Sequence, residues 1–360
     1  MNVKVADYQR PPVKVAIVGC GRAMYSEHYP IFKKHPTLFE VVAACDLVKD
    51  RRDLILADFP RARMYRQFGE MLDDGDIDLV DIATCSQDHA AHAMASLRRG
   101  FWTLLESPMA LSFEDANMLR GQAVKSKNRL IVFNRGCFAP DFLLARQAIA
   151  DPRLGEIHQI RICEEDYLRR DDWQTLKRVG GGAAWYALPD RTIQALKLLP
   201  APPVQMWSEL RRIASLGDAE DCCHVALKTR GTLTAHIEYN GGSLPGPDRR
   251  PSFEILAERG SFRVAPGAVE GVLRVIDPDH KFPRRRSAVR TPPLKDLHEE
   301  FPIVEIPVRL PPGTAYGPSA FWRHIYDAVR IAAPFPLALE DSLEAVKLSS
   351  LMKRTSPFSK

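Results

Sequence analysis

The chain has 360 residues with 50 basic and 45 acidic side chains, so its formal net charge is only +5. This length allows two domains with full cores, and the small, dispersed charge makes nucleic acid a poor partner. No apolar run approaches the roughly 20 residues of a membrane span, and the first residues lack the apolar core of a signal peptide, so we expect a cytoplasmic protein with no membrane partner.

The first predicted element is a buried strand that runs directly into a glycine-rich turn, in the segment VKVAIVGCGRA at 13–23. Gly19 allows a tight turn, and Gly21 lets the backbone approach a pyrophosphate at the start of the next helix. Free N–H groups and the helix dipole favour an anion there. Met24 stands where the third glycine of a GxGxxG pattern would be.

A second predicted strand, FEVVAACD at 39–46, ends in Asp46, whose carboxylate is placed to accept hydrogen bonds from the adenosine ribose. This order of elements, a strand, a turn, a helix and a second strand that ends in an acid, predicts a dinucleotide site. We expect NAD rather than NADP because Asp46 would repel a 2′-phosphate, although Lys49, Arg51 and Arg52 weaken that preference. The residues of the turn assigned to cofactor binding are Gly19, Cys20, Gly21, Arg22, Ala23 and Met24.

The alternation of strands and helices continues to about residue 135. Strands are predicted at 62–65, 77–84, 102–106 and 130–134, and helices at 49–57, 89–99 and 113–127. Six strands joined by right-handed crossovers predict an N-terminal Rossmann domain of the α/β class, a doubly wound parallel sheet over residues 1–135. Ligands of such sheets lie at the carboxyl ends of the strands, which here are Gly19, Asp46, Thr84, Glu106 and Asn134.

From about residue 151 the pattern changes to strands without intervening helices. These strands are predicted at 157–163, 204–210, 222–229, 232–239, 253–257 and 272–275. They indicate a C-terminal α/β domain over 136–335 with a large, mostly antiparallel open sheet, interrupted by a helical stretch after the glycines at 180–182. An exposed sheet face predicts a homodimer or homotetramer.

The last part of the chain is predicted to combine a loop with two helices. The segment 277–312 is rich in proline and charge and is expected to run over the surface, including the basic cluster KFPRRR at 281–286. Helices are expected at 320–331 and 339–352, and the one within 336–360 is expected to pack back near the first domain.

The cysteines give no sign of a metal site. There are seven of them and no CxxC pair, so we expect reduced thiols. Asp221 and His224 flank Cys222 and Cys223, but this spacing fits a strand with alternating faces better than a set of metal ligands.

Seven motifs, in order, resemble the Gfo/Idh/MocA family of sugar and cyclitol dehydrogenases over nearly the whole chain. They are GCGRA with the later His28 and Pro30, IATCSQDHAAHA, ESPMAL, VFNRGCFAP, DPRLGEI, DDWQTLKRVGGG and FWRHIYDAVRIAAPFPLALEDSLEA. The resemblance implies that Trp173 lines the substrate cleft, with core packing as the alternative. It implies that Arg135 lies near the nicotinamide, with an interdomain salt bridge as the alternative. The other implied cofactor contacts are Thr84, Cys85, Ser86, His89, Glu106 and Ser107.

The sequence departs from the resemblance at the residues that carry the family's chemistry. The family has a lysine in an EKP turn and an aspartate and histidine in a DxGxH helix, whereas this chain has Ser107, Tyr186 and Asp190 there. Loss of a positioned acid or base costs about 10² to 10⁴ in rate, so another group must act if the protein is an enzyme.

Four residues are assigned to the altered catalytic site, namely Tyr186, Asp190, Ser107 and Lys177. A serine hydroxyl is a poor base at neutral pH, so Tyr186 and Asp190 are the candidates for the missing proton transfer. Tyr186 and Asp190 would share one helix face unless Pro189 breaks the helix, and both are also assigned to substrate binding. The alternative is that Tyr186 packs in the core and Asp190 caps a new helix. Lys177 could supply the missing ammonium or could be an ordinary surface lysine.

Two classes of function therefore remain open. The first is an NAD-dependent oxidoreductase of a sugar, sugar derivative or cyclitol with a rebuilt proton-transfer site, or a lyase that uses NAD without net redox change. The second is a catalytically silent protein that binds a dinucleotide or sugar and regulates a partner.

Overall fold

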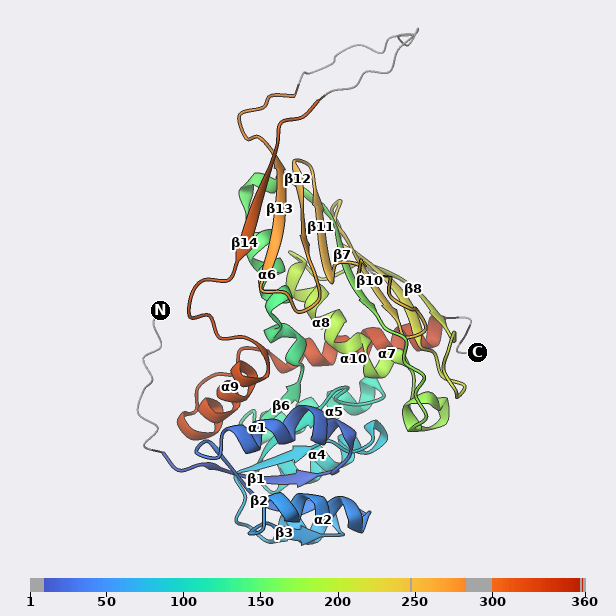
Figure 1. Cartoon of the computed structure of the whole chain (residues 1–360). Helices are drawn as coiled ribbons and strands as arrows, with labels where there is room; N and C mark the ends of the chain where they lie inside the picture. The colour runs from blue at the N-terminus through green and yellow to red at the C-terminus, as the bar shows by residue number, and fades with distance from the viewer. Residues whose placement is uncertain (1–9, 247, 283–299, 357, 359–360) are drawn as a thin grey trace.

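The computed structural model of the protein describes residues 10–246, 248–282, 300–356 and 358. Figure 1 shows a parallel sheet with its helices in blue and cyan, and a second, larger sheet that rises from it. Helices α8 (Leu188–Leu198) and α10 (Leu339–Thr355) lie between the two sheets, and α6 (Pro140–Ile149) lies against one face of the larger sheet. Among the described residues, no helix is both long and apolar enough to cross a membrane.

The first sheet has six strands in the order β3-β2-β1-β4-β5-β6, and all of its strand pairs are parallel. Its strands are β1 (Val13–Val18), β2 (Phe39–Cys45), β3 (Arg63–Tyr65), β4 (Leu79–Ile82), β5 (Trp102–Glu106) and β6 (Leu130–Phe133). Its helices are α1 (Tyr29–Lys34), α2 (Lys49–Asp58), α3 (Phe68–Asp73), α4 (His89–Arg98) and α5 (Phe113–Lys125). The expected doubly wound Rossmann sheet is confirmed.

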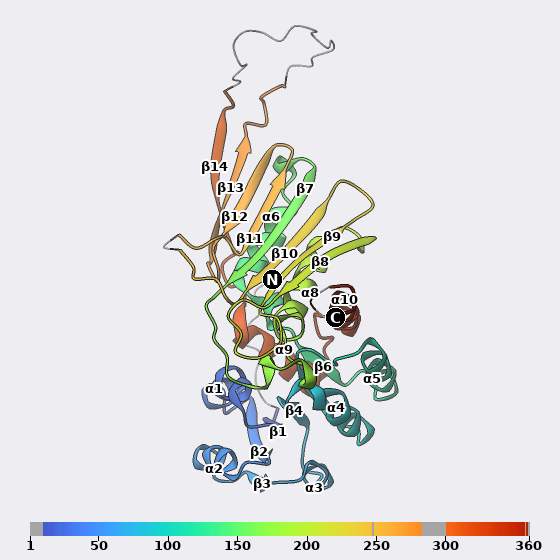
Figure 2. The same ribbon diagram turned by 90° about the vertical axis from the view of Figure 1, so that its right-hand side faces the viewer.

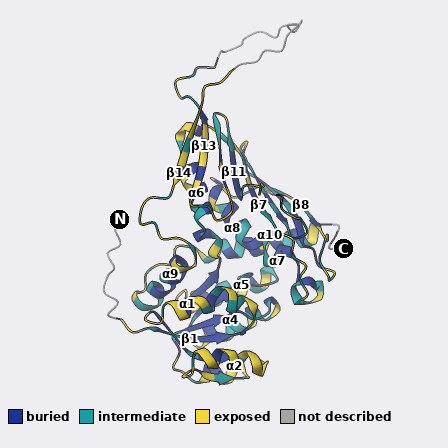
Figure 3. Ribbon diagram, viewed as in Figure 1, coloured by how far each residue is buried: buried dark blue, intermediate teal, exposed yellow. Residues whose placement is uncertain are grey.

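Sequence explains why these strands form a parallel sheet covered on both faces. Every residue of β4 is buried, and β1 has one partly exposed residue, as expected for strands with helices on either side. Figure 3 shows this buried centre in dark blue above α2, whose outer side is exposed. The strand order reverses between β1 and β4, and ligands of such sheets bind at the crevice beside this reversal.

The second sheet has eight strands in the order β14-β13-β12-β11-β7-β10-β9-β8. They are β7 (Ile157–Glu165), β8 (Gln205–Arg211), β9 (Cys222–Lys228), β10 (Thr234–Asn240), β11 (Phe253–Ala257), β12 (Gly260–Val264), β13 (Glu270–Ile276) and β14 (Ile303–Arg309). Only β7 and β10 pair in parallel, so the expected mostly antiparallel sheet is confirmed.

One face of the second sheet is covered and the other is open. Alternate residues of β10 and β13 are buried, as expected for a sheet with a single packed face. Helix α6 (Pro140–Ile149) packs on β11, β12 and β13, and α8 (Leu188–Leu198) packs on β7 and β10. Figure 2 shows the broad sheet with these helices behind it.

One expectation about the elements after residue 135 is wrong, and two further elements were not predicted. Strand β14 lies inside the segment 277–312 that was expected to be a surface loop. It is an edge strand whose residues are mostly exposed, and an edge tolerates Pro307, so no clear apolar alternation marks it. Strand β12 and helix α6 were not predicted at all. The basic cluster at 281–286 extends outside the described residues.

The helical stretch after the glycines is two helices rather than one. Helix α7 (Ala183–Tyr186) ends just before α8, and Ala187 stands between them. Pro189 lies in the first turn of α8, where its missing N–H costs nothing, but it could not continue the hydrogen bonds of α7.

The last two helices pack on the parallel sheet and its helices, and α10 also contacts β8 of the second sheet. Helix α9 (Gly317–Ile331) packs against α1 and β1, and α10 (Leu339–Thr355) packs against α5, β6 and α8. Asn134, at the end of β6, donates to the hydroxyl of Ser342 in α10 over 2.6 Å. Lys353 of α10 pairs with the buried Glu220 at 2.8 Å. Helix α10 therefore holds the parallel sheet and the second sheet in one packed unit.

Candidate functional site

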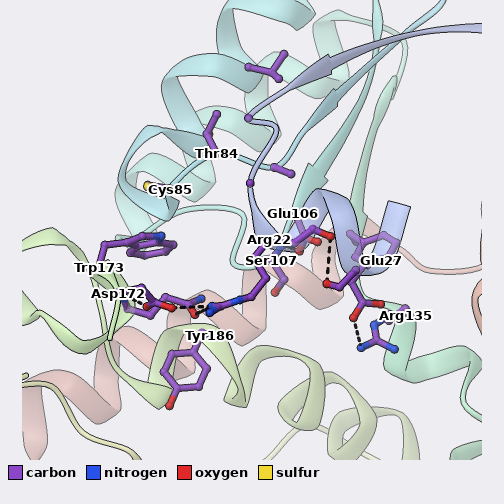
Figure 4. A pocket seen from close by; sticks show the side chains of 18 of the residues that line it. Arg22, Glu27, Thr84, Cys85, Glu106, Ser107, Arg135, Asp172, Trp173 and Tyr186 are labelled. Atoms are coloured by element: carbon purple, nitrogen blue, oxygen red, sulfur yellow. Dashed lines mark hydrogen bonds and ion pairs between the residues drawn. The ribbon is translucent and has the colours of Figure 1, made fainter. Parts of the chain in front are cut away.

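A cleft of about 1230 Å³ lies between the two sheets, at the carboxyl ends of the parallel strands. Figure 4 shows residues of the parallel sheet on one side and Trp173 and Tyr186 on the other. The sequence-predicted residues that line it are Gly19, Gly21, Arg22, Ala23, Asp46, Thr84, Cys85, Glu106, Ser107, Arg135, Trp173, Tyr186 and Asp190. Among the described residues, no group of His, Cys, Asp or Glu could hold a metal ion.

The two glycines of the first turn differ in the space around them that an added side chain could fill. Gly19 has φ +85°, and a Cβ added to it would lie 2.7 Å from the carbonyl oxygen of Ala83. A Cβ on Gly21 would meet nothing closer than Arg51, at 3.9 Å. Gly19 is therefore required by the protein's own packing, whereas the space beside Gly21 is open to the cleft, and this arrangement fits a dinucleotide pyrophosphate.

The carboxylate of Asp46 is fixed at the end of β2. It accepts the N–H of Cys20 on Oδ2 and the N–H of Val48 on Oδ1, each at 2.8 Å. The guanidinium of Arg51 lies 3.7 Å from Oδ2 and also lines the cleft, while Lys49 pairs with Asp53 instead. Arg51 is thus the basic residue placed to compete with Asp46 for a 2′-phosphate.

A buried charged group lies behind the cleft, against the turn that carries Ser107. His28 ends a π-helical turn (Met24–His28), with Nδ1 2.9 Å from Asp81 Oδ2 and Nε2 2.9 Å from Glu106 Oε1. Burial alone would lower the pKa of His28, but the two carboxylates outweigh it and raise that pKa to about 10. The ring is therefore an imidazolium at neutral pH that donates from both nitrogens.

Sequence reasoning gave His28 no role beyond its place in a motif. The signal that could have found it is Asp81, an acid in the middle of the apolar strand β4, because a fully buried carboxylate needs a partner. Glu106 uses its second oxygen to accept the N–H of Ser107 at 3.0 Å. His28 consequently fixes the turn that carries Ser107.

Four predicted cofactor residues lie behind the surface of the cleft. Cys20, Met24, Ser86 and His89 are buried and do not line it. His89 Nδ1 donates to the carbonyl of Pro108 over 2.7 Å, and Nε2 lies 3.1 Å from the carbonyl of Thr84. The structure thus places His89 between the loops that follow β4 and β5, where it positions Thr84 and Ser107.

Tyr186 and Asp190 both line the cleft but differ in chemistry. Burial raises the pKa of the Tyr186 phenol, and its ring packs edge-on against Tyr239. The Asp190 carboxylate accepts the N–H of Gly136 on Oδ2 at 3.1 Å. Its Oδ1 is buried and has no hydrogen-bond partner among the described residues. Burial raises the pKa of Asp190 to about 6, against the opposing charge of Arg191.

Gly136 explains how Asp190 can occupy this position. A Cβ on Gly136 would lie 3.0 Å from Asp190 Oδ2 and 3.0 Å from the amide nitrogen of Gln194. Without a side chain there, Asp190 reaches the backbone N–H, and Gln194 donates to the Gly136 carbonyl over 2.7 Å. The structure therefore provides a specific place for an aspartate at position 190.

Three further candidates have defined positions. Lys177 does not line the cleft: its ammonium donates to the Phe358 carbonyl over 2.8 Å and lies 4.0 Å from that ring. Arg135 pairs with Glu27 at 2.9 Å, and both face the cleft. Trp173 also lines the cleft, so of these three only Lys177 is not brought to it.

Sequence reasoning missed a contact that crosses the cleft. Arg22, after the glycine turn, pairs with Asp172 at 2.8 Å and donates to Gln174 over 3.0 Å. Figure 4 shows Arg22 and Asp172 pointing toward each other from opposite sides. The first helix and the turn that carries Trp173 are therefore linked beside the candidate nicotinamide position.

The glycine turn, Asp46 and the cleft define an oxidoreductase that binds a nicotinamide dinucleotide. Residues 13–134 match the oxidoreductase family with an NAD-binding Rossmann fold, and residues 142–263 match the GFO/IDH/MocA C-terminal domain. The chain belongs to the Gfo/Idh/MocA family.

Its relatives include characterised and uncharacterised dehydrogenases. An uncharacterized oxidoreductase of Schizosaccharomyces pombe is 30% identical over 262 residues, 70% of each chain. The scyllo-inositol 2-dehydrogenase (NADP(+)) of Bacillus subtilis is 25% identical over 69% of this chain and 68% of its own. The solved WlbA dehydrogenase from Bordetella pertussis, in complex with NADH and UDP-GlcNAcA, has TM-score 0.72 and 20% identity over 96% of each chain.

We predict that His28→Gln destabilises the protein by about 3 to 5 kcal/mol near neutral pH, because Asp81 and Glu106 then lack a cation. The folded pKa of about 10 exceeds the ordinary 6.5, so the imidazolium contributes fully below pH 6.5 and its contribution is lost as pH rises through 10. Chemical unfolding should therefore show a difference from wild type that shrinks toward pH 10. A difference independent of pH would contradict this, and the exposed His158→Gln is the control.

We predict that Asp190→Asn is more stable, relative to wild type, at pH 8 than at pH 4. The folded pKa of about 6 lies above the ordinary 3.8, so the ionised carboxylate costs stability that appears between these values and persists above them. The cost is on the order of 2 to 3 kcal/mol. Thermal melting at both pH values measures it, and equal shifts at both would show that the carboxylate is not perturbed.

Proposed function

We propose that the protein is an NAD-dependent dehydrogenase of a sugar, sugar derivative or cyclitol, in which Asp190 exchanges the hydroxyl proton. The Rossmann sheet, the open space beside Gly21 and the fixed carboxylate of Asp46 support the cofactor. The cyclitol dehydrogenase among the relatives supports the substrate class. The observation that carries the proposal is the buried, unpartnered Oδ1 of Asp190 in the wall of the cleft.

Oxidation of an alcohol requires loss of a hydride from carbon and of a proton from oxygen. The bound nicotinamide would supply the hydride acceptor. The protein's own task is to hold the hydroxyl and take its proton, and a carboxylate with a pKa of about 6 can do so near neutral pH. In the reverse direction, protonated Asp190 would return the proton to the new alkoxide.

Asp190 suits this role better than the other candidates. Burial raises the pKa of Tyr186, so its phenol stays protonated at neutral pH and cannot accept the proton, and the ring lines the cleft. A serine hydroxyl such as that of Ser107 is also a poor base at neutral pH. Glu106 is already bound by His28 and by the backbone N–H of Ser107.

We predict that Asp190→Asn lowers kcat/KM by about 10² to 10⁴ while the affinity for NAD stays within a few-fold of wild type. Wild-type oxidation should fall below about pH 6, as Asp190 becomes protonated, and this acid limb should be absent in the variant. Ketone reduction should fall above that pH instead. The measurement is the absorbance of reduced cofactor as it forms or disappears with each of a panel of polyols and keto sugars.

Tyr186→Phe is the matched comparison, since it keeps the ring and removes only the hydroxyl. We expect it to retain the acid limb. A wild-type profile without this limb, or full activity in Asp190→Asn, would remove Asp190 from the mechanism. Binding of NAD with no redox change on any substrate would favour the regulator, and product formation without net redox change would favour the lyase.

The proposed preference for NAD rests on Asp46. We predict that Asp46→Ser tightens NADP binding at least about tenfold, because it removes the charge that repels the 2′-phosphate and leaves Arg51 available to pair with it. Calorimetric titration of wild type and variant with both cofactors measures this. Asp53→Ser, which alters an exposed partner of Lys49, is the control. Tighter binding of NADP than NAD by wild type would show that Arg51 outweighs Asp46.

We also propose that the protein forms a homodimer or homotetramer through the open face of the second sheet. Trp207 is 59% exposed on β8, and it lines a shallow depression with His224 and His236 of the neighbouring strands. A second copy of the chain would cover this mixed apolar and polar surface.

A further inference from the structure

The arginines around Tyr186 and Asp190 differ in how closely a carboxylate pairs with each of them. Among the described residues that line the cleft, the chain after residue 140 contributes two arginines, Arg170 and Arg191. Arg191 pairs with Glu164 at 2.7 Å, so its charge is matched. The carboxylate nearest to Arg170 is Asp172, at 3.9 Å, and Arg22 lies closer to that carboxylate, at 2.8 Å. Arg170 therefore shares a single carboxylate with Arg22, which lies closer to it.

The geometry of Arg170 leaves donors available. Its guanidinium carbon lies 4.7 Å from the centre of the Tyr186 ring, and Nη1 donates to the side-chain oxygen of Gln174. Nε is buried and has no hydrogen-bond partner among the described residues. A guanidinium stacked on a ring keeps its N–H groups in its own plane, where a carboxylate can accept two of them at once.

Asp190 does not balance this charge. The charges that act most strongly on Asp190 are those of Arg191, Arg135 and Glu106. A buried charged donor without a partner is unfavourable, and an anionic ligand in the cleft would relieve that cost. The position of Arg170 against Tyr186 puts such a ligand in the same cleft as Asp190.

We propose that Arg170 binds a carboxylate carried by the substrate, so that the protein prefers an acidic sugar or a carboxylated cyclitol to a neutral polyol. This inference rests on the proposed dehydrogenase function for the hydroxyl that reacts at Asp190. A carboxylate fits better than a phosphate, since one guanidinium matches one negative charge. The neighbouring Asp172 would also repel a dianion.

The test compares matched acidic and neutral ligands by calorimetry on the full chain saturated with NAD. The pairs are D-glucuronate with D-glucose, D-galacturonate with D-galactose, and quinate with myo-inositol. We expect at least one acid to bind at least tenfold more tightly than its neutral partner. Arg170→Gln should remove this ratio and leave neutral-ligand and NAD binding unchanged, while Arg170→Lys should restore part of it.

Arg169→Gln is the matched control, because this neighbouring arginine is exposed and does not line the cleft. The inference is overturned if no acid binds more tightly than its neutral partner, or if Arg170→Gln weakens NAD instead. It is also overturned if D-glucose 6-phosphate binds more tightly than D-glucuronate through Arg170. Binding is measured apart from NADH formation. An acid preference without redox turnover would therefore count against the dehydrogenase and leave the carboxylate site standing.

Discussion

The imidazolium of His28, enclosed between two carboxylates, is the interaction on which the cleft depends. It joins the helix that follows the glycine turn to β4 through Asp81 and to β5 through Glu106. Phe133 and Trp322 pack against the ring, so water cannot replace either carboxylate. Removing His28 would leave two buried carboxylates without their cation, so the imidazolium ties the three elements together. The turn bearing Ser107 and the start of the first helix therefore keep one relative position.

The opposite wall of the cleft shows a different principle, since its polar groups are incompletely satisfied. Asp190 retains an oxygen without a partner and Arg170 retains a nitrogen without one, and both are held by neighbours that fix their position. Behind one wall of the cleft the buried polar atoms are hydrogen-bonded, whereas the opposite wall keeps polar atoms without partners. Unpaired buried groups cost stability, and their persistence at one cleft is typical of a site that binds and transforms a ligand.

The parallel sheet could be predicted well because its signals are local. A buried strand, Gly19 and the terminal Asp46 follow one another within a short span. Each of these features indicates one part of a dinucleotide-binding Rossmann sheet. The second sheet was predicted less completely because β14 is an exposed edge strand with no clear alternation.

The site was predicted in part for the same reason. The strand-end residues Thr84 and Glu106 were expected at one edge of the sheet, because topology places strand ends together, and both line the cleft. The pairing of Asp172 with Arg22 and the role of His28 were missed, since their partners are distant in sequence and only packing brings them together. Arg170 was missed although its contacts are local, because no motif marks it. Lys177 was predicted at the site because its side chain is suitable and lies near a motif, but packing places its ammonium against Phe358 instead.

The position of α10 bears on how the protein is made. This helix packs on α5 and β6 of the parallel sheet, and its Ser342 contacts a residue 208 positions earlier. A ribosome completes all six parallel strands long before it adds this helix, so the apolar side of α5 and the end of β6 stay uncovered during synthesis of the second sheet. The nascent chain is therefore expected to expose a binding surface for chaperones over this interval, which closes only when residues 339–355 have emerged.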